Sequence, residues 1–479
     1  MIAVLTNEQD FDYDIYSLVK AFYPCEDVKV FGMDETVDEC SERFILTKEN
    51  DTYVFLKDGI CLSTESFEEN SDRVLRKNAV KRVVYKGLSS FLGKELPWGD
   101  LTGIRPTKIS RKMFDEGKSD EEVYRYLKDT YLVSDEKALL SMDISKRERE
   151  ILRPLRHKGY SLYIGIPFCP TTCLYCSFTS LPISMWKKSV MDYLKALEKE
   201  IAYVAKLGKD KIIDTIYIGG GTPTSLDASE LEELLSFIEE HFDVLNLLEF
   251  TVEAGRPDSI TKEKLQVLLK HHVTRISVNP QTMNQETLDF IGRRHTVSDV
   301  KNAFYLARET GFNNINMDII LGLPGEGAKE VSHTVDEIVR LSPDSFTVHS
   351  LAVKRGSRLY EAIRQKGYPE MINTDETMKI AAEGASLLGM KPYYLYRQKN
   401  MAGNLENTGF AKEGCYGIYN ILIMEEVQSI LACGAGTVTK RVYEDGSNAR
   451  CDTVKDIKMY IENIDEMIER KRTLFEVFS

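Results

Sequence analysis

The sequence contains no run of eighteen apolar residues, and its first residues, MIAVLTNEQDFDYD, lack the basic start and apolar stretch of a secretory signal. We therefore expect a cytoplasmic protein with no membrane span. Proline and glycine are scarce, at 14 and 30 of 479 residues, whereas 43% of the residues are hydrophobic. A chain of this length and composition can bury large cores, which predicts a folded protein of two or three domains.

Basic residues are fewer than acidic ones. Lys and Arg number 62 against 75 Asp and Glu, the formal net charge is -13, and no basic block interrupts the chain. Such a chain repels phosphate backbones, so we expect no nucleic-acid partner. The nine cysteines are an odd number in a long chain without a secretory signal, which makes a disulfide framework unexpected. The cysteines without ligand spacing, expected as reduced thiols, are Cys25, Cys40, Cys61, Cys415, Cys433 and Cys451.

Four segments follow one another along the chain. Short β-rich runs and helical stretches in residues 1–95 predict a small α/β N-terminal domain. Residues 96–157 start with the turn-rich LPWGDLTGIRPTK and continue as a mostly helical connector. Residues 158–351 alternate β-runs with helix-like stretches, and residues 352–479 predict a mixed, largely helical C-terminal region on the substrate side.

The alternating segment determines the predicted fold class, which is α/β. Its six β-runs are residues 161–166, 214–219, 248–253, 275–279, 314–322 and 345–350. Parallel strands need a crossover helix between them, so this series predicts a partial (β/α)6 barrel with helices on the outer face. Functional residues are then expected on the loops that leave the C-terminal ends of the strands.

GIPFCPTTCLYC, residues 165–176, places three cysteines directly after the first β-run. Cys169, Cys173 and Cys176 have the spacing C-x-x-x-C-x-x-C, and no fourth Cys or His lies nearby in the sequence. Four thiolates would close a tetrahedral zinc site, whereas three suit a [4Fe-4S] cluster with one iron left open. Chance clustering and a zinc site remain alternatives at this point.

The cysteine spacing, with an aromatic residue before the third Cys, resembles that of radical S-adenosylmethionine (SAM) enzymes. From about residue 160 to residue 440 the chain resembles the oxygen-independent coproporphyrinogen III dehydrogenases, in particular the HemZ branch with its N-terminal extension. The resemblance implies that the three cysteines hold a [4Fe-4S] cluster and that SAM chelates its fourth iron. It also implies that one electron, from a donor such as flavodoxin or ferredoxin, cleaves SAM into methionine and a 5'-deoxyadenosyl radical.

The loops after the later β-runs supply one SAM-binding candidate each. The glycines of GGGTPT would let the backbone approach a ligand closely, although a tight turn is the alternative. Glu253 ends the third run, in TVEAGRPD, and could instead cap the next helix or face water. The alternatives for Gln281, Arg293 and Asp318 are a turn amide, a solvated basic pair, and a helix-capping or buried, paired Asp. The resemblance implies SAM contacts for Tyr175, Gly219, Gly220, Gly221, Thr222, Glu253, Gln281, Arg293 and Asp318.

Other residues are assigned to the reaction and the substrate. Tyr163 matches the Tyr of the family's YIHIPFC motif and is the predicted catalytic residue, with a core aromatic as the alternative. An anionic tetrapyrrole needs local cations, and the candidates are Arg105, Arg293, Arg294 and Arg397. Arg397, in YRQKN, would hold a propionate bidentately unless it forms an ordinary surface ion pair.

Two positions depart from the family pattern. Gly165 stands where YIHIPFC has a histidine, and Ser177 with Phe178 follows the third Cys where the dehydrogenases have C-x-C. The YCSF ending is similar to the YCDF of related haem chaperones. The resemblance implies a radical SAM oxidoreductase of haem biosynthesis that converts coproporphyrinogen III to protoporphyrinogen IX. The alternatives are a haem chaperone and a radical SAM methyltransferase acting on a tetrapyrrole.

Overall fold

The computed structural model describes residues 1–476 apart from 25, 38, 69, 104, 157, 355–356, 367–370 and 399–404. Cys25 and most of the stretch after YRQK therefore lie outside the described residues. The chain divides into two units, of which unit 1 comprises Met1–Arg147 with Leu395–Glu406. Unit 2 comprises Glu148–Tyr394 with Asn407–Ser479.

Unit 1 begins with a five-stranded sheet in the order β2-β1-β3-β4-β5. Strand β1 is parallel to β2 and β3, while β4 and β5 continue the sheet in antiparallel pairs. The strands are β1 (Ile2–Thr6), β2 (Val28–Gly32), β3 (Glu42–Glu49), β4 (Thr52–Lys57) and β5 (Ile60–Ser66). Helices α1 (Asp12–Phe22) and α2 (Arg73–Leu92) pack their apolar side chains against it. This is the α/β extension that the sequence predicts.

The rest of unit 1 is helical and is built around Trp98. The helices are α3 (Thr107–Asp115), α4 (Asp120–Tyr131) and α5 (Asp135–Ile151). Trp98 is fully buried and donates from Nε1 to Glu406 Oε2 at 2.7 Å, and Lys137 Nζ lies 2.8 Å from the other oxygen of Glu406. Segment 395–406 therefore supplies a buried acceptor to the core of unit 1.

Arg397, predicted as a propionate contact, lies in the same core. Its side chain is buried, its Nη1 donates to the Leu101 carbonyl at 2.6 Å, and its guanidinium lies 5.8 Å from the ring centre of Trp98. This placement gives the guanidinium interior partners and argues against both the substrate contact and the surface ion pair.

Unit 2 contains an eleven-stranded sheet in the order β14-β15-β13-β12-β11-β10-β9-β6-β16-β17-β18. Its centre consists of six parallel strands that neighbour one another in chain order. They are β6 (Gly159–Ile166), β9 (Ile212–Gly220), β10 (Glu249–Glu253), β11 (Arg275–Ser277), β12 (Ile315–Leu321) and β13 (Ser345–Ser350). The predicted series of six βα strands is confirmed, and the sheet is open at both ends.

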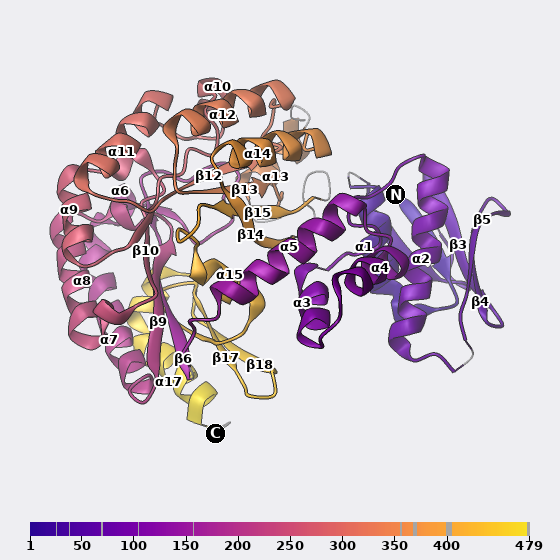
Figure 1. Cartoon of the computed structure of the whole chain (residues 1–479), viewed down its shortest axis with the longest axis horizontal. Coiled ribbons are helices and arrows are strands. Elements are labelled where there is room, and N and C mark those ends of the chain that lie inside the picture. The colour runs from indigo at the N-terminus through magenta and orange to yellow at the C-terminus, as the bar shows by residue number, and fades with distance from the viewer. Residues whose placement is uncertain are drawn as a thin grey trace. The chain divides into compact units, whose positions relative to one another are not determined.

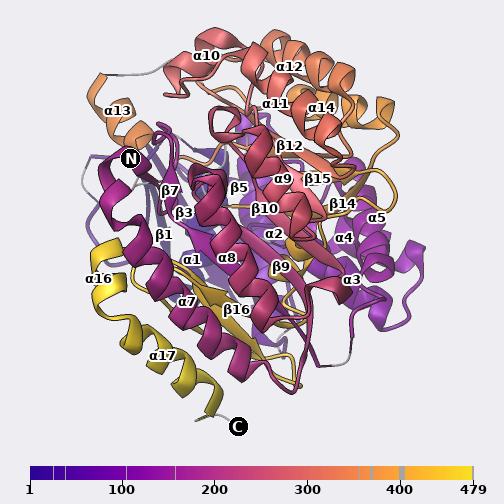
Figure 2. The ribbon, with the colours of Figure 1, turned by 90° about the vertical axis from the view of Figure 1, so that its left-hand side faces the viewer.

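The crossover helices form the outer layer of unit 2. Neighbouring helices α7, α8, α9 and α11 lie side by side along the sheet (Figures 1 and 2). The helices are α7 (Val190–Leu207), α8 (Ala228–His241), α9 (Lys262–Lys270), α10 (Gln285–Phe290), α11 (Val297–Thr310) and α12 (Ala328–Leu341). Helix α11 starts at a capping box of Thr296 with Asp299 and ends at Gly311, whose φ of 122° suits glycine.

The C-terminal region adds strands to both edges of the sheet and helices between them. Strand β15 is antiparallel to β13, whereas β16 is parallel to β6 and is followed by β17 and β18. The strands are β14 (Lys391–Tyr396), β15 (Asn407–Ala411), β16 (Ser429–Cys433), β17 (Val438–Val442) and β18 (Asn448–Asp452). The helices are α13 (Arg358–Lys366), α14 (Asp375–Leu387), α15 (Ile418–Glu425), α16 (Ile457–Glu462) and α17 (Ile464–Glu476). No described helix has both the length and the apolar composition of a bilayer-spanning segment.

Candidate metal centre and cofactor site

The three predicted cluster ligands lie on one loop after β6. Cys169 ends the short strand β7 (Phe168–Cys169), which pairs with β8 (Leu181–Pro182) on the far side of the loop. Cys169 and Cys173 are buried and Cys176 is half-buried. Thr222 Oγ1 lies 3.4 Å from the sulfur of Cys169, and Ser180 Oγ lies 3.3 Å from that of Cys176. Hydroxyl groups therefore stand beside two of the three sulfurs.

Backbone hydrogen bonds anchor this cysteine loop to its surroundings. The Leu174 N–H donates to the Ile291 carbonyl at 2.9 Å, and the Leu181 N–H donates to the Pro167 carbonyl at 2.8 Å. The Thr171 hydroxyl donates to the Gly292 carbonyl at 3.2 Å. The loop is thus held by the segment after β11 as well as by its own strand.

The donor set suits an iron–sulfur cluster better than a single metal ion. Across the described ranges, no three His, Cys, Asp or Glu side chains converge closely enough to bind one ion. A [4Fe-4S] cluster places each cysteine on a different iron, so its ligands need not converge on one point. Burial raises the pKa of Cys169 to about 12 and also raises that of Cys176, so both remain neutral thiols unless a cation stabilises the thiolate. Bound iron would supply that charge.

The glycine loop after β9 packs directly on the cysteine loop. The Gly221 N–H donates to the Ile166 carbonyl at 2.8 Å, and the Thr222 N–H donates to the Phe168 carbonyl at 2.7 Å. A Cβ at Gly221 would lie 2.6 Å from the Phe168 carbonyl oxygen, and Gly220 has a φ of +103°. The close approach of the two backbone segments therefore requires glycine in this loop, whether or not a ligand binds there.

Glu253 leaves the end of β10 and lies beside this glycine loop. The Tyr217 hydroxyl donates to Glu253 Oε1 at 2.5 Å, and a Cβ at Gly219 would lie 3.0 Å from the Glu253 carboxyl carbon. Burial raises the pKa of Glu253 to about 7; the Tyr217 hydrogen bond opposes this shift and the charge of Asp318 adds to it. A cationic ligand group at this carboxylate would relieve the cost of its burial.

Gln281, in the segment after β11, pairs with the middle of β12, where Asp318 lies. The Gln281 N–H donates to the Asp318 carbonyl at 3.0 Å. Asp318 accepts from Asn316 at 2.6 Å and lies 3.6 Å from His349 Nε2; these partners outweigh the effect of burial and lower the pKa of Asp318. Gln281 Oε1 and Asn279 Oδ1 are buried and have no hydrogen-bond partner among the described residues. A ligand that donates hydrogen bonds would satisfy these orphaned acceptors.

Two arginines lie in the loop after α10. Arg293 is 5% exposed, and its Nη1 donates to the carbonyls of Asn279 and Pro280, so it supports the loop that carries Gln281. Arg294 is exposed. Arg105 belongs to unit 1.

Tyr163 forms a stack of three tyrosines with Tyr217 and Tyr419. The ring centres of Tyr163 are 6.0 Å from Tyr217 and 5.9 Å from Tyr419, with interplanar angles of 16° and 18°. Tyr163 is the register partner of Tyr217, and Gly165 that of Gly219. The repeated Tyr-Ile-Gly of the two strands could have revealed Tyr217, whereas Tyr419 comes from α15 and no sequence signal places it here.

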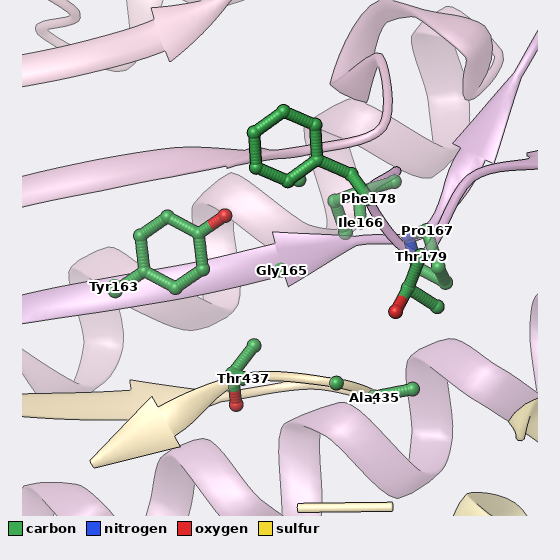
Figure 3. A pocket seen from close by; sticks show the side chains of 10 residues that line it. Tyr163, Gly165, Ile166, Pro167, Phe178, Thr179, Ala435 and Thr437 are labelled. Carbon is green, nitrogen blue, oxygen red and sulfur yellow. The ribbon is translucent and has the colours of Figure 1, made fainter. Parts of the chain in front are cut away.

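A small cavity of about 50 Å³ lies beside Gly165 (Figure 3). Tyr163 and Gly165 face it from β6, and Thr437 faces it from the turn between β16 and β17. A Cβ at Gly165 would lie 2.6 Å from Thr437 Cγ2, so the threonine methyl occupies the place of a side chain at 165. The cavity is lined by Tyr163, Gly165, Ile166, Pro167, Phe178, Thr179, Gly220, Ala435, Gly436 and Thr437.

The turn that carries Thr437 is held by a buried ion pair. Glu200 of α7 accepts from the Gly434 N–H at 2.7 Å and from the Tyr460 hydroxyl at 2.5 Å, and it pairs with Lys471 of α17. Both members of the pair are fully buried. The C-terminal helix therefore supports one wall of the cavity.

Arg256 is a residue of the site that the sequence analysis missed. It follows Glu253 by three positions, is 2% exposed, and its Nη1 lies 3.6 Å from the sulfur of Cys173. An arginine in a turn-rich loop gives no sequence signal for such a contact, because only the pairing of β6, β9 and β10 brings the two loops together.

Comparisons with known proteins agree with this geometry. Residues 163–338 match the model of the radical SAM superfamily. The chain is 43% identical over 413 residues to the oxygen-independent coproporphyrinogen-III oxidase-like protein HemZ of Bacillus subtilis, covering 84% of this chain and 82% of that protein. It is 35% identical over 311 residues to the heme chaperone HemW of Bacillus subtilis, covering 64% and 76%.

A solved structure shares the fold. Coproporphyrinogen III oxidase (HemN) from Escherichia coli, described as a radical SAM enzyme, matches with a TM-score of 0.52 and 21% identity over 67% of this chain and 72% of that one. Members of this superfamily use a [4Fe-4S] cluster and SAM, and the cysteine loop and orphaned acceptors described above fit both groups. The chain therefore belongs to the radical SAM superfamily, within the family of oxygen-independent coproporphyrinogen-III oxidase-like proteins.

Proposed function

We propose that the protein is an oxidoreductase that converts coproporphyrinogen III to protoporphyrinogen IX without oxygen. Its 43% identity with an oxygen-independent coproporphyrinogen-III oxidase-like protein over most of both chains supports this activity. The observation that carries the proposal is the meeting of the cysteine loop, the glycine loop and Glu253 at the C-terminal ends of β6, β9 and β10. A series of parallel βα units of this kind places its chemistry at that end.

The chain's residues have distinct tasks in this proposal. Cys169, Cys173 and Cys176 would hold the cluster. When bound, the cluster and SAM supply one-electron chemistry that removes a hydrogen atom from carbon. Glu253 would bind the SAM amino group, because an ammonium beside a buried carboxylate stabilises its ionised form.

The remaining predicted contacts would orient SAM. The orphaned oxygen of Gln281 and the carboxylate of Asp318 would accept hydrogen bonds from it. The backbone of Gly219, Gly220, Gly221 and Thr222, the ring of Tyr175 and the guanidinium of Arg293 would surround it. Tyr163, half-buried at the cavity, would separate the reacting carbon from solvent.

An exposed aromatic and a cation beside the cysteine loop suit a flat, carboxylated substrate. Phe178 is 70% exposed, and Lys354 Nζ lies 5.9 Å from its ring centre. We propose that Phe178 stacks on a pyrrole ring while Lys354 pairs with a propionate. At each of two propionates, one β-hydrogen atom would be taken up by the radical chemistry that SAM supplies. CO2 would then leave and one electron would pass to a one-electron acceptor, which leaves a vinyl group.

The proposed one-electron reaction also needs an electron donor and a reducing cellular compartment. We propose a small one-electron carrier, such as flavodoxin or ferredoxin, as the electron donor. We also propose a cytoplasmic location, because unpaired cysteines such as the exposed Cys61 persist as thiols in a reducing compartment.

A haem chaperone is the second candidate. The identity of 35% with a heme chaperone supports it. The contact between Gly165 and Thr437 leaves no room for the histidine of the dehydrogenase motif, which removes one feature of the dehydrogenases. Stoichiometric haem binding without conversion of porphyrinogen would favour this candidate.

Mass spectrometry of the full chain, reconstituted anaerobically with iron and sulfide, tests the proposal. With SAM, a strong reductant and coproporphyrinogen III, the protein should form deoxyadenosine and remove two CO2 per tetrapyrrole. Cys173→Ala should abolish both products, and Cys415→Ala, a matched cysteine outside the loop, should leave both unchanged. Deoxyadenosine formation with an unaltered porphyrinogen would contradict the proposed substrate.

A further inference from the structure

The three cysteine sulfurs have different neighbours. Hydroxyl groups stand beside Cys169 and Cys176, whereas the guanidinium of Arg256 stands beside Cys173, with Nη1 3.6 Å from the sulfur. The same Nη1 donates to the Thr171 hydroxyl at 3.0 Å and toward its carbonyl at 3.4 Å. One buried side chain thus contacts the cysteine loop at two positions.

The orientation of Arg256 is fixed from its other side. Its Nε and Nη2 donate to the two carboxylate oxygens of Asp258 at 2.9 and 2.8 Å, which is a bidentate pair. Arg256 is 2% exposed, and Ser259 Oγ donates to its carbonyl at 2.7 Å. With Nε and Nη2 engaged by Asp258, Nη1 is directed at the cysteine loop.

The groups that contact the other two sulfurs are neutral hydroxyls: Thr222 Oγ1 lies 3.4 Å from the sulfur of Cys169, and Ser180 Oγ lies 3.3 Å from that of Cys176. Among the described side-chain contacts of the three sulfurs, the cationic one is therefore made to Cys173.

We propose that Arg256 is a positioning residue of the iron–sulfur centre that holds Cys173 in place and raises the reduction potential of the bound cluster by donating a hydrogen bond to the Cys173 sulfur. Reduction adds one electron to the cluster, and that negative charge resides partly on the ligand sulfurs. A hydrogen bond from a cation stabilises the reduced state more than the oxidised state, and such bonds are among the factors that set cluster potentials. Asp258 moderates the effect because its carboxylate offsets part of the guanidinium charge.

Three variants of the full chain separate this role from simple support of the fold. Arg256→Gln removes the charge and replaces the guanidinium donor with a shorter, neutral amide, so the midpoint potential should become more negative. A tenfold loss of preference for the reduced state corresponds to about 59 mV in a one-electron couple. Arg256→Lys keeps the charge and should shift the potential less. Asp258→Asn leaves the guanidinium uncompensated and should shift the potential in the positive direction.

Redox titration followed by electron paramagnetic resonance measures these potentials on anaerobically reconstituted protein, normalised to bound iron and sulfide. Arg308→Gln is the matched control, because it breaks another Arg–Asp pair of unit 2, with Asp344 at 2.6 Å, and should leave the potential unchanged. Equal potentials in wild type and Arg256→Gln would overturn the proposal. If Arg256→Gln retains no cluster, a shift of the same sign in Arg256→Lys and Asp258→Asn would overturn it.

The redox titration requires no tetrapyrrole, so its result tests the role of Arg256 independently of the proposed substrate. A protein that leaves coproporphyrinogen III unaltered should still show the opposite shifts of the Arg256 and Asp258 variants.

Discussion

The contact between Gly165 and Thr437 gives a prediction whose sign can be worked out from the geometry. Gly165 lacks a positive φ, so its backbone accepts alanine. The added methyl would lie 2.6 Å from Thr437 Cγ2, while its other neighbours, the Cys433 carbonyl and the Tyr163 ring, lie at ordinary contact distances of 3.5 and 3.7 Å. Thr437 therefore decides the cost of the substitution.

Through overpacking, Gly165→Ala should lower the free energy of unfolding of unit 2 by about 1–3 kcal/mol. Alanine also restricts the unfolded chain more than glycine does, which should restore about 0.4–1 kcal/mol of that loss. Thr437→Ser removes the clashing methyl and keeps the hydroxyl that donates to the Gly434 carbonyl at 2.8 Å. Alone it should cost about 1 kcal/mol, as the loss of one buried methyl does. In the serine background, Gly165→Ala should become neutral or stabilising, so the two changes are strongly coupled.

Urea unfolding followed by circular dichroism measures the four free energies of this cycle. Gly103→Ala is the control, since nothing lies within 4 Å of a Cβ built there, and its effect should be the same with Thr or Ser at 437. Additive effects of Gly165→Ala and Thr437→Ser would refute the reasoning, and with it the conclusion that Thr437 occupies the place of a side chain at 165.

Three further predictions concern buried charges and the metal ligands. Lys471→Met should destabilise the protein by about 3–5 kcal/mol in thermal unfolding, because Glu200 would remain buried without its cation, and adding Glu200→Gln should recover part of the loss; equal stability of wild type and Lys471→Met would contradict this. The pKa of Glu253, raised to about 7, means that the folded state binds more protons than the unfolded state between pH 4.5 and 7, so stability should fall by up to about 3 kcal/mol as the pH rises through this window. Glu253→Gln should reduce the change of unfolding free energy with pH, as measured by urea titrations at several pH values. An unchanged pH dependence in this variant would mean that other groups cause it. Cys176→Ala should lower the iron bound after reconstitution, whereas Cys451→Ala should not, as measured by iron and sulfide analysis.

Local and periodic features of the fold could be predicted from the sequence. The six parallel strands follow from β-runs and helices that alternate along the chain, and each observed strand lies within a few residues of its predicted range. The proposal that Cys169, Cys173 and Cys176 hold the cluster also rests on local spacing. Pairings between distant segments could not be predicted from the sequence. Examples are β16 beside β6 and the inclusion of segment 395–406 in unit 1. These depend on tertiary packing, which no local pattern records.

The same distinction holds within the site. Glu253 could be placed because it ends a β-run, and strand ends meet at one edge of a parallel sheet. Asp318 lies in the middle of β12, so its position in the strand does not single it out. Arg256 and Tyr419 escaped prediction because their roles come from contacts with another loop and another strand. For Arg397 the sequence offers a propionate contact or a surface ion pair, whereas the structure gives its side chain interior partners.

Transfer of deuterium from substrate to cofactor tests the central claim most directly. The full chain, reconstituted anaerobically, would receive SAM, reductant and coproporphyrinogen III deuterated at the β-carbons of its propionates. The proposed function predicts one deuterium in each deoxyadenosine and one deoxyadenosine for each CO2 released. Deoxyadenosine without deuterium, formed while the porphyrinogen keeps its propionates, would contradict it.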